Sequence, residues 1–236
     1  MDSTTAPATT RLTVDLWADV LCPWCYIGGH RLVRTVRTSS HADAIDLRIR
    51  TFQLDPAAPA TVSRTLEHLS RTYGISPAQA RATEAGLAQR AAVEGLRYEI
   101  DRPVGNTSDM LRLVHLGKGH GLAWEYLRAM QTEVFTGNGN AFEHDTLVRL
   151  GERLGIPGEE IRETLSTGRY LDAVRADHAE AVALGATGVP FTVLGGRLGI
   201  PGAASRSQYA AAIERAWEGV GAESGAVRRF LRQPVM

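Results

Sequence analysis

The only two cysteines of this 236-residue chain lie three positions apart, in the run Cys22-Pro23-Trp24-Cys25. Two thiols one helical turn apart can reach one another and interconvert between a dithiol and a disulfide. At a helix start, free N–H groups and the positive end of the helix dipole favour an anion, and the thiolate is the attacking form of cysteine. We therefore expect Cys22 to attack a disulfide and Cys25 to resolve the mixed disulfide that forms.

A zinc site and a pair of inert core residues are the alternatives to redox chemistry for these cysteines. A zinc site needs four ligands, but the chain has no second cysteine pair and its seven histidines are scattered. Two buried, inert cysteines are a fair alternative, because free cysteine is often buried. The proline between them and the strand that precedes them favour redox chemistry, and we expect no metal.

The elements that must position this pair begin with a strand, in which Leu12, Val14 and Leu16 alternate with polar residues and Trp17. A helical stripe starts after Pro23, a residue that suits the first turn of a helix. Cys22 is therefore expected at the helix N-cap. The period of two over residues 45–50 predicts a second strand.

Helical signals dominate residues 61–169, and a further helix is expected over residues 171–182. Residues 190–194 are typical of a strand, and Gly195-Gly196 predicts a hairpin turn before a return strand. Ser205 and Gln208 form a capping box that opens a last helix.

This order predicts an α/β protein: β-α-β, a helical block, then α-β-β-α around one sheet, which is the thioredoxin arrangement with a helical insertion. The expected thioredoxin-like domain is discontinuous, covering residues 12–60 and 170–220. The insertion covers residues 61–169, and residues 1–11 and 221–236 are expected to be flexible termini.

Charge and composition limit the partners. With 26 basic and 26 acidic residues, the chain has no net field for holding nucleic acid or an anionic membrane. No apolar run is long enough to span a bilayer, and the N-terminus lacks the features of a signal peptide. We therefore expect a cytoplasmic protein, where thiols are kept mostly reduced, and a homodimer would be unsurprising.

Four segments resemble the DsbA family of thiol–disulfide oxidoreductases, specifically its FrnE-like branch. They are the run 19–28 (Asp-Val-Leu-Cys-Pro-Trp-Cys-Tyr-Ile-Gly), the segment 52–56 (Phe-Gln-Leu-Asp-Pro), the pair Asn106-Thr107, and the loop 185–191 (Gly-Ala-Thr-Gly-Val-Pro-Phe). The resemblance extends over nearly the whole chain. It implies a thioredoxin fold with an all-helical insertion.

The resemblance also implies roles for residues outside the cysteine pair. Pro190 is expected to be cis and to face the cysteines, and Val189 would pair its backbone with an extended substrate chain. Trp24 would offer an apolar contact, and Pro23 would make the turn rigid. The expected catalytic residues are Cys22, Cys25 and Pro190, and the expected substrate-binding residues are Pro23, Trp24 and Val189. The substrates would be disulfide-containing proteins or small thiols, with no cofactor beyond the redox pair and with glutathione as a co-substrate.

Three departures from the family pattern affect these expectations. The residues between the cysteines are Pro-Trp, so the cationic imidazole of the strongly oxidising Pro-His enzymes is missing. Gly29 stands where relatives often carry a basic residue, which could open space near the site. The segment 201–204 reads Pro-Gly-Ala-Ala instead of Ser-Gly-Ala-Gln, so no contact is assigned to it.

Two further functions compete with disulfide exchange. The same fold resembles glutathione-dependent isomerases of the 2-hydroxychromene-2-carboxylate type and kappa-class glutathione transferases, with a role in polyketide metabolism conceivable. Those enzymes typically carry serine at the position of Cys22 and lack the second cysteine, so the retained pair favours redox chemistry. A non-enzymatic holdase would need an exposed apolar groove, and the sequence gives no sign of one.

Overall fold

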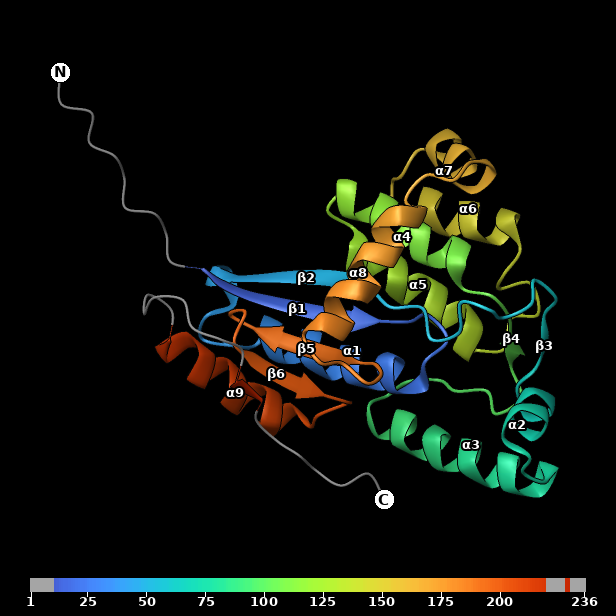
Figure 1. Cartoon of the computed structure of the whole chain (residues 1–236), viewed down its shortest axis with the longest axis horizontal. Helices are drawn as coiled ribbons and strands as arrows, with labels where there is room; N and C mark the ends of the chain where they lie inside the picture. The colour runs from blue at the N-terminus through green and yellow to red at the C-terminus, as the bar shows by residue number, and fades with distance from the viewer. Residues whose placement is uncertain (1–10, 220–227, 230–236) are drawn as a thin grey trace.

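A five-stranded mixed sheet forms the centre of the protein, with its strands in the order β2-β1-β5-β6-β7 (Figure 1). The computed structural model describes residues 11–219 and 228–229. The strands of the sheet are β1 (Leu12–Ala18), β2 (Ile45–Thr51), β5 (Phe191–Leu194), β6 (Leu198–Pro201) and β7 (Arg228–Arg229). Of the termini expected to be flexible, residues 1–11 and 221–236, only residue 11 and residues 228–229 are among the described residues, and residues 228–229 pair with β6.

The strand pairing follows the order predicted from the sequence. β1 and β2 are parallel, and α1 (Pro23–Arg37) connects them through a short 3₁₀ turn, Ala42–Ala44. β5 runs antiparallel to β1 and continues into β6 through a tight turn. Gly195 and Gly196 both have positive φ, 58° and 67°, as this hairpin turn requires.

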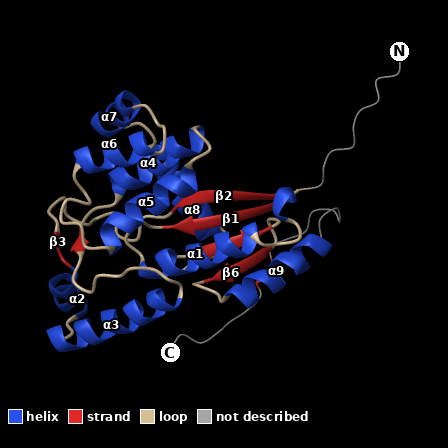
Figure 2. Ribbon diagram, turned by 180° about the vertical axis from the view of Figure 1, so that it is seen from behind, coloured by secondary structure: helices blue, strands red, loops and turns tan. Residues whose placement is uncertain are grey.

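Helices cover both faces of the sheet. α8 (Leu171–Ala183) lies in front of the strands in Figure 1, and α1 lies in front of them in Figure 2, with α9 (Arg206–Glu218) beside it. The alternation along β1 explains the two layers: Leu16 belongs to the core beneath α1 and α9, and Trp17 packs with Phe191 beneath α8. Each face of the sheet therefore has its own apolar core.

The segment between β2 and α8 is mostly helical but contains a short ribbon. Its helices are α2 (Thr65–Tyr73), α3 (Pro77–Val93), α4 (Ser108–Gly119), α5 (Ala123–Phe135), α6 (His144–Arg153) and α7 (Gly158–Ser166). β3 (Ser63–Arg64) and β4 (Pro103–Val104) form an antiparallel pair, so the expectation of an entirely helical insertion was wrong in this detail. Next to the ribbon, the Thr65 N–H and hydroxyl both donate to the Arg102 carbonyl, at 3.0 and 2.8 Å, and continue the pairing by one position.

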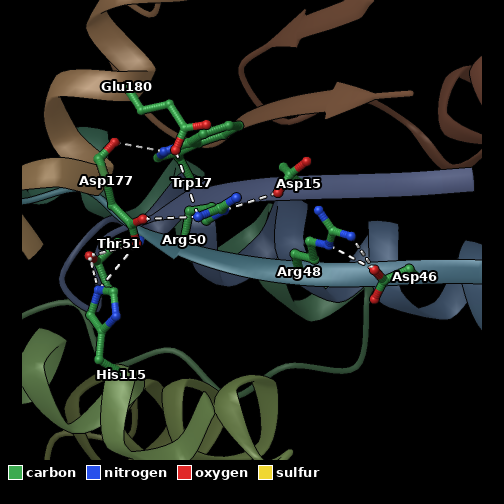
Figure 3. A network of polar contacts seen from close by, with 9 residues as sticks. All are labelled: Asp15, Trp17, Asp46, Arg48, Arg50, Thr51, His115, Asp177 and Glu180. Carbon is green, nitrogen blue, oxygen red and sulfur yellow. Dashed lines mark hydrogen bonds and ion pairs between the residues drawn. The ribbon is translucent and has the colours of Figure 1, made fainter. Parts of the chain in front are cut away.

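A polar network joins α4 and α8 to the sheet (Figure 3). The Asp177 carboxylate accepts hydrogen bonds from the Thr51 N–H at 2.9 Å, and it lies 3.1 Å from His115 and 3.3 Å from Arg50. Arg50 also pairs with Asp15 on β1 at 3.0 Å. Burial opposes the ionisation of Asp177, but the hydrogen bonds from His115 and Thr51 outweigh it and lower the pKa of the carboxyl.

Among the described residues, no helix combines the length and the apolar character needed to cross a membrane.

Candidate redox site

Cys22 occupies the N-cap of α1, as predicted from the sequence. Its backbone is extended (φ −74°, ψ 116°), Pro23 follows in the first turn, and the Tyr26 N–H donates to the Cys22 carbonyl at 3.0 Å. Cys25 lies one turn inside the helix. Both are free thiols and nearly buried, with 5% of Cys22 and 1% of Cys25 exposed. Cys22 is therefore slightly the more exposed of the two residues.

The loop before β5 brings Val189 and Pro190 to the cysteine pair. The Cys22 thiol donates a hydrogen bond to the Val189 carbonyl oxygen, with 3.3 Å between sulfur and oxygen. The Val189–Pro190 peptide bond is cis. The Pro190 carbonyl accepts a hydrogen bond from the Gly202 N–H at 2.8 Å, which connects this loop to the segment after β6.

The surroundings of Cys25 oppose the ionisation of its thiol. Burial, with the Cys22 thiol beside it, raises the pKa of Cys25 well above its usual range. Cys25 is therefore protonated at neutral pH.

The exposed part of the site is apolar and partly basic. Trp24 is 39% exposed, and the guanidinium of Arg90 on α3 lies 5.7 Å from the centre of its ring. Leu21, Pro23 and Val189 are partly exposed around the sulfur. The part of the site open to solvent therefore consists mainly of the Trp24 indole and partly exposed apolar residues.

Asp19 is a buried residue of the site to which the sequence alone assigned no role. Its carboxylate accepts hydrogen bonds from the Leu21 N–H at 3.1 Å, the Leu54 N–H at 2.8 Å and the Thr107 hydroxyl at 3.4 Å. Burial raises its pKa despite these donors, and no cationic side chain of the described residues forms an ion pair with it. Its place three residues before Cys22 was a visible signal, but its contacts depend on residues far along the chain.

Gly28 allows α1 to lie close against the site. A Cβ atom at this position would lie 2.8 Å from the Ala203 Cβ and 3.1 Å from the Pro190 Cγ. The segment 201–204, to which the sequence alone assigned no contact, therefore packs directly on α1.

The expectation that Gly29 opens space near the site was wrong. A Cβ atom there would meet the Trp124 ring at 3.1 and 3.3 Å. The indole from α5 fills the space left by the missing side chain, so Gly29 serves packing between α1 and the insertion.

Within the described part of the chain, no three His, Cys, Asp or Glu side chains lie close enough together to hold a metal ion.

Comparison with known proteins decides the family. A family model described as the DSBA-like thioredoxin domain matches residues 13–214. The chain belongs to this family. The fold expected from the sequence, a DsbA-like thioredoxin fold, is thereby confirmed.

Solved structures agree with the DSBA-like assignment. A probable DsbA oxidoreductase from Streptomyces coelicolor is 35% identical, with a TM-score of 0.83 over 96% of this chain and 93% of that one. A 2-hydroxychromene-2-carboxylate isomerase is 18% identical, with a TM-score of 0.63 over 87% of this chain and 96% of that one. The cytosolic disulfide reductase DsbM from Pseudomonas aeruginosa, solved with glutathione, is 18% identical, with a TM-score of 0.55 over 87% and 99%. The last two likenesses concern the fold alone.

Proposed function

We propose that this DSBA-like protein is a thiol–disulfide oxidoreductase of the FrnE-like branch, with the Cys-Pro-Trp-Cys run as its redox pair. One observation carries the proposal: the Cys22 sulfur lies at the start of α1, 3.3 Å from the Val189 carbonyl, with Cys25 one turn behind it. A nucleophilic sulfur, a resolving sulfur and a backbone group for substrate alignment thus lie together.

The exchange proceeds in two displacements. The Cys22 thiolate attacks one sulfur of a substrate disulfide, forms a mixed disulfide and releases the first substrate thiolate, which takes up a proton. Cys25 then loses its proton, attacks the Cys22 sulfur and releases the second substrate thiol. Two electrons and two protons have passed to the substrate, and Cys22 and Cys25 are joined by a disulfide. The reverse sequence oxidises a dithiol substrate.

The neighbouring residues align the substrate. Val189 offers backbone pairing to an extended chain, and Pro190 holds this segment beside the cysteines without an N–H of its own. Trp24 supplies apolar contact next to the sulfur, and Pro23 limits the freedom of the turn. These groups bind or orient the substrate, whereas the bonds that form and break belong to Cys22 and Cys25.

A cytoplasmic enzyme of this kind needs a small thiol to return its disulfide to the dithiol. We propose glutathione, or a thiol of similar chemistry, as that co-substrate. The DsbM structure, solved with glutathione and described as a cytosolic disulfide reductase, gives a precedent in a similar fold.

Reduction of insulin disulfides tests this function. Wild-type protein should catalyse the reaction, Cys22→Ser should abolish it, and Cys25→Ser should accumulate mixed disulfides. If Cys22→Ser reduced insulin at the native rate, the proposed mechanism would be wrong.

Isomerase or transferase chemistry is the alternative, because a 2-hydroxychromene-2-carboxylate isomerase has a similar fold. The presence of both cysteines favours exchange over that chemistry. Glutathione-dependent isomerase turnover by the Cys22→Ser/Cys25→Ser double variant would support the alternative.

A further inference from the structure

Leu54 is exposed although its backbone is fixed next to the redox site. It lies in the loop that follows β2, and 48% of its surface is exposed. Single exposed apolar side chains are common on protein surfaces, but the loop that carries Leu54 is held at several points.

Two hydrogen bonds donated by backbone N–H groups attach this loop to the segment that leads to Cys22. The Phe52 N–H donates to the Ala18 carbonyl at 3.0 Å, and the Leu54 N–H donates to the Asp19 carboxylate at 2.8 Å. The same carboxylate accepts the Leu21 N–H at 3.1 Å. Leu21 and Leu54 are therefore bound to the two oxygens of one carboxylate, and Leu21 immediately precedes Cys22.

The insertion holds the loop from its other side. The Asn106 side chain accepts a hydrogen bond from the Gln53 amide at 3.0 Å and donates one to the Ala58 carbonyl at 2.7 Å. The Thr107 hydroxyl donates to the Asp19 carboxylate at 3.4 Å. The segment 52–56 and the pair Asn106-Thr107, two of the segments that resemble the DsbA family, therefore meet in one hydrogen-bonded cluster.

Two exposed apolar side chains thus stand on segments that either follow Cys22 directly or are hydrogen-bonded to the residues just before it. Trp24 stands on the first turn of α1, and Leu54 stands on the fixed loop beside Leu21. A contact residue that is already immobile loses little conformational entropy when a partner binds. Small thiols such as glutathione carry no apolar side chain for such a contact, whereas polypeptides commonly do.

We propose that Leu54 is a specificity-determining contact that, together with Trp24, selects polypeptide substrates with an apolar side chain next to the reacting cysteine. Asn106 and Asp19 are positioning residues, since they act by holding the loop that carries Leu54. This inference rests on the proposed function and adds a substrate class to it.

Disulfide exchange with matched peptides tests the contact. Two peptide disulfides differing only in Leu or Ser beside the cysteine are compared with glutathione disulfide, for wild type, Leu54→Asp, Leu54→Met and Val182→Asp. Val182 is a matched control because it is 53% exposed and lies on α8, across the sheet from α1. Substitution of an exposed side chain also leaves the core intact.

For wild type and Val182→Asp we expect kcat/KM to favour the Leu peptide over the Ser peptide by about tenfold, the discrimination available from burying one such side chain. Leu54→Asp should abolish this preference and lower the ratio of Leu-peptide to glutathione-disulfide kcat/KM by about tenfold, and Leu54→Met should restore both. Asn106→Ala should weaken the preference without changing the number of reactive thiols.

An unchanged Leu preference in Leu54→Asp would overturn the proposal, as would an equal loss for peptide and glutathione disulfide. The proposed function fails separately, if wild type shows no Cys22-dependent exchange with any of the three disulfides.

Discussion

The Cys22 sulfur lies 3.3 Å from the carbonyl oxygen of Val189, a residue 167 positions further along the chain. The contact joins the start of α1 to the loop before β5. The parts of the thioredoxin unit that precede and follow the insertion therefore meet at the Cys22 thiol. The chain between these two residues includes the whole insertion, which begins after β2 and ends before α8. The site therefore depends on how closely α1 packs against that loop.

Gly28→Ala tests this packing. The added Cβ would lie 2.8 Å from the Ala203 Cβ and 3.1 Å from the Pro190 Cγ, so α1 must move away from the loop. We expect a loss of about 1–3 kcal/mol in the free energy of unfolding and slower exchange at Cys22. In the matched control Gly86→Ala, the nearest atom is 3.7 Å away, and stability should rise by up to about 1 kcal/mol. Urea unfolding measures both, and equal stability of the Gly28 variant and wild type would refute the packing argument.

The rate of the resolving step should continue to rise to a higher pH than that of ordinary thiol chemistry. Burial raises the pKa of Cys25, and only its thiolate can attack the mixed disulfide. In single-turnover experiments, the rate of release of the second substrate thiol should keep rising beyond about pH 8.5, the usual value for a thiol. A rate that levels off below that pH would contradict a buried, protonated Cys25. Cys25→Ser provides the baseline without this release.

Asp177→Asn should destabilise the junction of α4, α8 and β2. The substitution removes the negative charge that His115 and Arg50 face. We expect the free energy of unfolding to fall by about 3 kcal/mol at pH 7. Because the folded-state pKa of Asp177 is lowered, its stabilisation is present above the unfolded pKa of about 3.9 and is lost as pH falls through the folded value. The difference between variant and wild type should therefore shrink in acid.

Asp172→Asn is the matched control on the same helix. Its side chain is 97% exposed, pairs with Arg175 on the surface and lies in the first turn of α8, so a loss of at most about 1 kcal/mol in the free energy of unfolding is expected. Similar losses in the two variants would mean that the network of Figure 3 does not stabilise the junction.

Asp19→Asn should give a pH dependence of the opposite sign. Burial raises the folded-state pKa of Asp19, so its contribution is fully present below the unfolded pKa of about 3.9 and is lost as pH rises through the folded value. Relative to Asp19→Asn, wild type should therefore lose stability as pH rises above about 4. Urea unfolding at several pH values measures the difference, and a wild-type advantage that grows with pH would rule out a raised pKa.

Local features of the fold were predictable from the sequence. The N-cap position of Cys22, the Gly195-Gly196 turn and the capping box of Ser205 all follow from neighbouring residues, and the structure contains each of them. These features depend on hydrogen bonds within a few positions of the chain, which a sequence pattern records directly.

Contacts between distant segments were not predictable in the same way. Trp124 fills the space at Gly29, and the Asp19 carboxylate binds the Leu54 N–H, across 35 positions. Nothing in the pattern around either residue specifies its partner, because tertiary packing decides which segments meet. The resemblance to relatives marked the segments 52–56 and 106–107 as notable, but their common role required the folded arrangement.

Trapping of the mixed disulfide tests the central claim most directly. Cys25→Ser is mixed with a peptide disulfide, quenched with acid and digested without reductant, and the linked fragments are identified by mass spectrometry. The proposed mechanism predicts one peptide adduct per chain, located on Cys22, and no accumulating adduct in wild type. An absence of any adduct on Cys22 in the Cys25→Ser protein, under conditions where wild type turns over the peptide, would contradict it.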